Sequence, residues 1–139
     1  MTAQVSTRIR SMAALEELLE RSGANAAIIA SRDGRPFAEK TRERIGVESG
    51  RLAAMASSLA ALGDGVLREL SSGALDHVLI EGSGGKFVVC RIPGAHNALV
   101  LAVHAGASAR LGLVLGQAKA CAVTLGTLIT VRTETAPRS

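Results

Sequence analysis

Hydrophobic positions form two kinds of pattern along the chain. In three segments they recur every three or four residues, which predicts helices, and between these segments short apolar runs bounded by turn-forming residues predict strands. The expected order is α-β-β-α-β-β-β-α. Helices are expected over residues 7–21, over 49–70 and after Ser108, and strands over 26–31, from Pro36, and over 76–81, 86–92 and 98–104.

The later strands carry continuous apolar runs rather than alternating apolar and polar residues. Residues 76–81 contain VLI, residues 86–92 contain FVVC and residues 98–104 contain LVLAV. Strands of this kind are buried on both faces, so helices must cover the sheet above and below. Hairpin-length loops make the five-stranded sheet mostly antiparallel, and Pro36 should begin its strand or lie at a sheet edge. We predict an α/β (α+β) fold, a three-layer α/β/α sandwich.

The central predicted helix carries more apolar residues than one buried stripe needs. Its large apolar residues follow helical spacing and are Leu52, Met55, Leu59, Leu62, Val66 and Leu70. Alanines accompany them at a density that permits close approach of a second helix. Gly63 and Gly65 weaken a helix, so we expect a bend or an early end there. If residues 76–81 end the sheet, their apolar edge invites pairing with a second chain.

Residues 81–87, EGSGGKF, suggest a phosphate-binding loop at first sight. A P-loop has the pattern G-x-x-x-x-G-K-[ST], and here Ile80 and Phe87 stand at its first and last positions. A dinucleotide-binding fingerprint also fails at Phe87, and a strand follows where a phosphate site needs a helix N-terminus. We interpret the stretch as a hairpin turn and expect no cofactor.

The sequence contains no recognisable catalytic or metal-binding arrangement. His77 follows Asp76 in a predicted strand, where neighbours point to opposite faces and could not form a dyad. Cys90 and Cys121 each lie inside an apolar run without the spacing of metal ligands, so we expect two small buried side chains. We therefore predict that the protein is not an enzyme and holds no metal.

Composition narrows the class of partner. A chain of 139 residues that is 47% hydrophobic can form one domain, expected over residues 7–131 with flexible termini at 1–6 and 132–139. Aromatic residues make up 1%, which argues against nucleic-acid modules that stack bases. The net charge is +4, and residues 82–139 carry 6 basic but 1 acidic side chain. This excess describes either a solvated surface or attraction to an acidic partner or anionic lipid.

Membrane and export signals are weak in the sequence. The N-terminus lacks the apolar core of a secretory signal. Residues 111–131 come nearest to a membrane span, and Lys119 with interior Gly and Gln residues interrupts them. We expect a cytoplasmic protein without membrane insertion, which could associate with a membrane through its partners.

Three stretches together resemble the roadblock/LC7 domain family. Residues 28–38, IIASRDGRPFA, are similar to its first hairpin, where the pattern Ser-x-Asp-Gly-x-Pro-hydrophobic-Ala recurs. Residues 77–92, HVLIEGSGGKFVVCRI, resemble its central hairpin, and residues 111–122, LGLVLGQAKACA, resemble the opening of its last helix. The resemblance covers about residues 8–130, and Arg35 departs from it where a hydrophobic residue is common.

The resemblance implies a profilin-like α/β/α sandwich that dimerises through its central helix and third strand, which joins two sheets into one. Bacterial members of the family are partners and regulators of Ras-like small GTPases. Similar actinobacterial proteins are encoded beside a GTPase and a sensor-kinase-like protein. By this resemblance we expect a non-catalytic homodimeric scaffold in bacterial signal transduction, which modulates the nucleotide state or the localisation of a small GTPase.

Helix and strand spacing, combined with the resemblance, identifies an expected interface. It consists of Arg51, Met55, Leu59, Leu62, Val78 and Ile80. The two strand residues would take part in edge pairing, the three apolar helix residues would lie in a helix-helix layer, and the arginine would lie near its rim. Two other functions stay open at this point: a ligand-sensing module of the same shape, and a purely structural subunit of a larger signalling complex.

Overall fold

The computed structural model describes residues 2–44, 46–94 and 99–135, which form three helices and one five-stranded sheet. The elements are α1 (Thr2–Ser22), β1 (Ala26–Ser31), β2 (Pro36–Thr41), α2 (Ser49–Glu69), β3 (His77–Gly82), β4 (Gly85–Arg91), β5 (Leu99–Gly106) and α3 (Leu111–Thr135). The strands lie in the order β2-β1-β5-β4-β3, and all pairings are antiparallel. The predicted order is confirmed, and Pro36 begins an edge strand.

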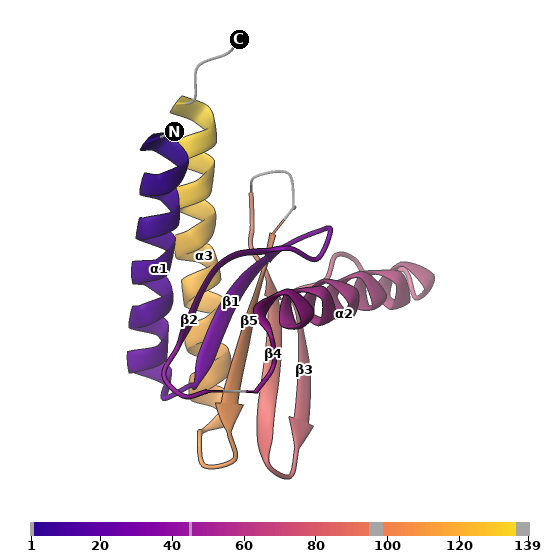
Figure 1. Cartoon of the computed structure of the whole chain (residues 1–139). Helices are drawn as coiled ribbons and strands as arrows, with labels where there is room; N and C mark the ends of the chain where they lie inside the picture. The colour runs from indigo at the N-terminus through magenta and orange to yellow at the C-terminus, as the bar shows by residue number, and fades with distance from the viewer. Residues whose placement is uncertain (1, 45, 95–98, 136–139) are drawn as a thin grey trace.

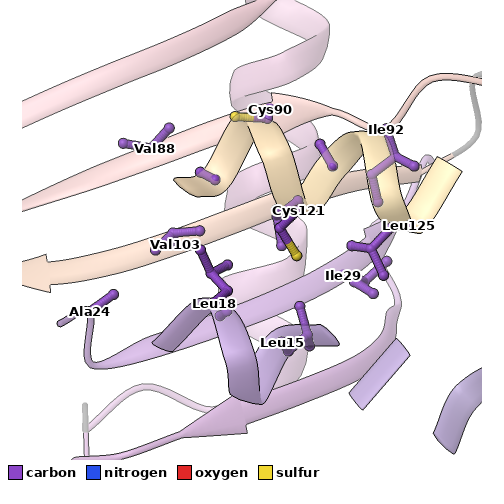
Figure 2. Close-up of a cluster of buried hydrophobic side chains, with 14 of the residues drawn as sticks. Leu15, Leu18, Ala24, Ile29, Val88, Cys90, Ile92, Val103, Cys121 and Leu125 are labelled. Atoms are coloured by element: carbon purple, nitrogen blue, oxygen red, sulfur yellow. The ribbon is translucent and has the colours of Figure 1, made fainter. Parts of the chain in front are cut away.

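Helices cover both faces of the sheet. Figure 1 shows α1 and α3 side by side on one face and α2 crossing the other. The core under α1 and α3 is aliphatic, and Leu15, Ile29, Val103 and Leu125 are fully buried there (Figure 2). The core under α2 contains mostly alanine, valine and leucine. The predicted three-layer α/β/α sandwich is confirmed.

Both outer helices are longer than the hydrophobic pattern predicted. α1 begins at Thr2, so residues 2–6 are helical where we expected an unstructured segment. α3 continues to Thr135, past the expected limit at residue 131. The two helices pack against each other (Figure 1), and tertiary packing supports helical turns whose own sequence pattern is weak. The domain limits of 7 and 131 remain a prediction.

The third strand departs from its predicted environment. The apolar runs of β4 and β5 are largely buried, as predicted, and that of β1 is buried as well. In β3, however, Val78 and Leu79 are half-buried and Ile80 is 46% exposed. β3 is an edge strand that pairs with β4 alone in this chain. Among the described residues β3 has no strand on its outer side and its side chains are only partly covered, so the prediction of burial on both faces was wrong for this strand.

The stretch EGSGGKF forms a hairpin turn, as predicted. Only residues 83–84 lie between β3 and β4. Lys86 is 6% exposed, and its Nζ donates to the carbonyl oxygens of Gly106, at 3.3 Å, and Ala107, at 3.1 Å. The lysine of this stretch therefore satisfies carbonyl groups at the end of β5 and is not presented to a ligand.

Alanine at position 126 is expected to destabilise the fold. A Cβ on the buried Gly126 would lie 2.5 Å from the carbonyl oxygen of Pro93, a backbone atom that cannot move alone. We expect Gly126→Ala to lower the free energy of unfolding by about 1–3 kcal/mol, measured by urea denaturation. Gly116→Ala is the matched control in the same helix. A Cβ there meets nothing within 4 Å, so its better helix propensity should add up to about 1 kcal/mol. Equal midpoints for both variants would contradict this close approach.

The raised pKa values of the two buried cysteines predict that the free energy of unfolding falls at alkaline pH. Burial raises the pKa of Cys90 from its ordinary 9.0 to about 11, and that of Cys121 to about 12. The unfolded chain therefore loses thiol protons first as pH rises above 9.0. Below that pH the thiols make their full contribution to the free energy of unfolding. As pH rises toward the folded pKa values, this contribution falls by about 1.4 kcal/mol per pH unit for each thiol.

Urea denaturation over this pH range tests the prediction. The double variant Cys90→Ala, Cys121→Ala is the control, and it should lose most of the alkaline decline. If the double variant declines as steeply as the natural chain, groups other than the thiols cause the effect.

Candidate interaction surface

The face of α2 that meets the sheet is lined with small side chains. Ala53, Ala56 and Ala60 are buried against it. Gly63 continues this face, since a Cβ there would lie 3.0 Å from Leu75 Cδ1. α2 is continuous through this glycine, so the early end that we expected does not occur. The alanines were expected to admit a second helix. Those on this face instead let α2 lie close to its own sheet, because a methyl group keeps the helix axis near the strands.

Several large apolar residues of α2 and its C-cap are exposed along one flank, while Leu59 on the same flank packs partly against the core under α2. Met55 is 41% exposed, Leu62 is 66%, Val66 is 50% and Leu70 is 67%, and of the predicted stripe only Leu52 is buried. The stripe was predicted from its spacing as an amphipathic helix face, and in a single chain most of that face meets water. We call this set the α2 flank: Met55, Leu59, Leu62, Val66 and Leu70. Contiguous exposed apolar surface of this kind marks interaction sites.

The β3 edge lies next to this flank. Val78 packs beneath α2, with its Cγ2 atom 3.2 Å from the Cβ position of Gly63. Ile80 points to the same side of the sheet, two residues further along, and is largely exposed. In this chain no strand pairs with the outer edge of β3 within the part of the chain that the structure describes. Its outward backbone N–H and C=O groups are therefore open to a strand from another molecule.

Of the six residues predicted for an interface, Leu59 and Val78 both pack against the core under α2, and Val78 lies next to Gly63. Met55 and Leu62 are exposed on α2 and Ile80 is exposed on β3. Their part in an interface stays a prediction. Arg51 is exposed in the first turn of α2, at the far end of the same flank. Val66 and Leu70 were not among the residues predicted for the interface, although helical spacing places them on the same stripe as Met55 and Leu62.

One predicted separation was wrong. Asp76 Oδ2 lies 3.2 Å from His77 Nδ1, although strand alternation predicted that these side chains diverge. Asp76 precedes β3 rather than lying within it, so the alternation does not apply. Lys119 Nζ is 2.8 Å from the same carboxylate oxygen, and the hydrogen bonds from Lys119 and His77 lower the pKa of Asp76. This exposed group joins α3 to the start of β3.

A second ion pair joins α2 to the sheet. Arg91 Nη2 donates to Asp64 Oδ2, and both side chains are about three-quarters buried. Asp64 Oδ1 accepts a hydrogen bond from the backbone N–H of Leu75 at 3.3 Å. No pattern in the sequence indicated this pair, because its partners lie 27 positions apart. Among the described residues, no group of three or more His, Cys, Asp or Glu side chains could hold a metal ion.

The chain belongs to the Roadblock/LC7 domain family, whose sequence pattern matches residues 12–105. The resemblance in the first hairpin, the central hairpin and the order of elements is thereby confirmed at the level of the family. No curated protein matches the chain.

Solved structures share the fold at low sequence identity. An MglB structure with a tetrameric arrangement has a TM-score of 0.83 at 23% identity, over 91% of this chain and 92% of its own. The gliding protein MglB from Thermus thermophilus has a TM-score of 0.80 at 22% identity, over 88% of this chain and 90% of its own. A Roadblock/LC7 domain from Streptomyces avermitilis has a TM-score of 0.74 at 19% identity, over 85% of this chain and 96% of its own.

One helix has the length and composition of a membrane span. Residues Leu111–Ile129 of α3 have a mean hydropathy of 1.4, and 39% of this stretch is buried inside the domain. One face of the helix packs on the sheet and on α1, as core helices of globular domains do. The finding is therefore weak evidence for a membrane, and the absence of membrane insertion stays a prediction.

Proposed function

We propose that this protein is a non-catalytic homodimeric scaffold that binds a Ras-like small GTPase and modulates its nucleotide state or its localisation in the bacterial cytoplasm. Membership of the Roadblock/LC7 domain family supports the regulatory class. The observation that carries the proposal is the exposed apolar α2 flank beside the unpaired edge of β3. We infer no catalytic residue, no cofactor and no nucleic-acid partner.

The dimer would use the α2 flank and the β3 edge together. A two-fold axis beside β3 would pair two antiparallel copies of that strand and bring two α2 flanks into contact, an isologous arrangement. The interface would contain Arg51, Met55, Leu59, Leu62, Val78 and Ile80, and we add Val66 and Leu70. Burial of each exposed leucine contributes about 1.5–3 kcal/mol. Edge pairing would also satisfy backbone groups that water solvates in the monomer.

The GTPase partner follows from the family and not from a pocket. A scaffold of this class would offer the dimer as one continuous surface, and a sensor-kinase-like protein would be a second partner in the same pathway. A purely structural subunit would share the dimer without recognising a nucleotide state. Comparing the protein's affinity for the GDP-bound and the GTP-bound GTPase therefore distinguishes a regulator from a structural subunit.

The experiment measures binding of the purified protein to Ras-like GTPases from its own source, loaded with GDP or with a non-hydrolysable GTP analogue. We expect tighter binding to the GTP form, followed by a change in hydrolysis rate. Equal affinity cannot shift the nucleotide-dependent equilibrium, so equal binding would reduce the role to localisation. Absence of binding to every such GTPase would contradict the proposal.

A further inference from the structure

A small pocket lies on the side of α2 that faces the turn between β1 and β2. Its volume is about 130 Å³, and four segments line it: the turn after β1, the second half of α2 with Ser57, the end of β4 and the start of β5. The lining residues are Arg32, Ser57, Ala60, Ala61, Asp64, Arg68, Arg91 and Val100. Three guanidinium groups therefore meet at one pocket, with a single carboxylate among them.

Two of these arginines have no internal partner. Within residues 2–44, 46–94 and 99–135, neither Arg32 nor Arg68 has a side-chain hydrogen bond or an ion pair. The other arginine of the turn, Arg35, does have one, with its Nε 3.4 Å from Asp33 Oδ2. The pocket thus carries three positive charges against one negative charge, a surplus of two. Arginine stays charged at every physiological pH.

The other polar groups of the pocket are engaged in contacts within the fold. Asp64 uses one carboxylate oxygen for Arg91 and the other for the backbone N–H of Leu75. Arg91 Nε is buried and has no partner in the structure. Ser57 Oγ donates to the carbonyl oxygen of Ser31 at 2.6 Å, which fixes the β1–β2 turn, and hence Arg32, against α2 (Figure 1). The carboxylate is therefore engaged, and the positive surplus lies with Arg32 and Arg68.

The pocket and the proposed dimer interface lie on different flanks of α2. At about 100° per residue, Ser57, Ala61 and Arg68 project from the flank opposite to Leu62 and Val66. A dimer built on the α2 flank would leave the pocket open to solvent. A ligand could then bind each protomer without displacing the partner.

We propose that this pocket binds a phosphate group, with Arg32 and Arg68 as its principal ligands and Arg91 as the fixed guanidinium at its base. Guanidinium groups donate paired hydrogen bonds that match phosphate oxygens, and such charge-assisted bonds are about twice as strong as neutral ones. The pocket volume suits one such group rather than a whole nucleotide. The group could belong to a free phosphate compound or to a phosphorylated lipid headgroup, which share this chemistry.

The test titrates the natural protein with pyrophosphate and follows the backbone amide resonances by NMR, with sodium chloride at equal ionic strength as the reference. We expect saturable shifts at Arg32, Ala61 and Arg68. The double variant Arg32→Gln, Arg68→Gln should bind at least about tenfold more weakly. Arg35→Gln is the matched control, since this exposed arginine lies in the same turn but outside the pocket, and it should bind as the natural chain does.

Vesicles separate the two sources of the phosphate group. Phosphatidylcholine vesicles with and without a phosphorylated inositol lipid are sedimented with the protein. Shifts with pyrophosphate and no added sedimentation would identify a free phosphate compound as the ligand. Sedimentation that requires the phosphorylated lipid and both pocket arginines would identify a headgroup. The proposal is overturned if neither probe binds, or if Arg35→Gln weakens binding as much as the double variant does.

Discussion

Leu62→Arg is expected to convert the proposed dimer into a folded monomer. Leu62 is 66% exposed in the single chain, so arginine at this position fits the monomer without strain. In a two-fold interface the substitution occurs twice, and it brings two like charges together in an apolar layer. Losing two leucine contacts removes about 3 kcal/mol or more, which weakens dimerisation at least about 100-fold. Analytical ultracentrifugation measures the change, and circular dichroism confirms that the fold is retained.

Leu113→Arg is the control for this experiment. Leu113 is 43% exposed but lies on α3, on the opposite face of the sheet. Its substitution should leave the dimerisation constant unchanged. If Leu62→Arg and Leu113→Arg behave alike, or if Leu62→Arg stays dimeric at micromolar concentrations, the α2 flank is not the interface.

Asp64→Ala is expected to give the second large effect, a loss of stability. The substitution leaves Arg91 without its ion-pair partner in a site where its side chain is 21% exposed. It also removes the acceptor of the Leu75 backbone N–H. Breaking a fully buried pair costs about 3–5 kcal/mol. The partial exposure here reduces this, so we expect about 2 kcal/mol in the free energy of unfolding, measured by urea denaturation.

Asp76→Ala provides the comparison. Asp76 also has an ion pair, with Lys119 Nζ at 2.8 Å, but its side chain is 69% exposed. Exposed pairs contribute little, so we expect almost no change in the urea midpoint. Equal losses in the two variants would mean that burial does not determine the strength of these pairs. Recovery of stability in Asp64→Ala with Arg91→Met would confirm that the unpaired charge causes the loss.

The sequence predicted the fold well because its signals are local. The continuous apolar runs of β1, β4 and β5, the Asp-Gly turn and the Ser-Gly turn each specify an element from neighbouring residues. The same patterns say nothing about how far a helix extends when a second helix supports it. For that reason α1 was predicted to begin at residue 7 and begins at Thr2.

The candidate surface was harder to predict from the sequence. Periodicity placed Leu52, Met55 and Leu62 on one stripe, but it could not tell which side of α2 meets the sheet. The alanine face packs on the sheet, because small side chains allow α2 to lie closer to the strands. The ion pair of Asp64 with Arg91 and the pocket of three arginines join segments far apart in the chain. No local pattern predicts such contacts, which depend on how α2 crosses the strands.

Native mass spectrometry of the protein, alone and with a GTP-loaded Ras-like GTPase from its own source, tests the central claim most directly. We predict a species of twice the 14.2 kDa chain mass, and a further species in which at least two copies of the chain hold the GTPase. A monomer alone together with no complex would contradict the account of a dimeric GTPase-binding scaffold.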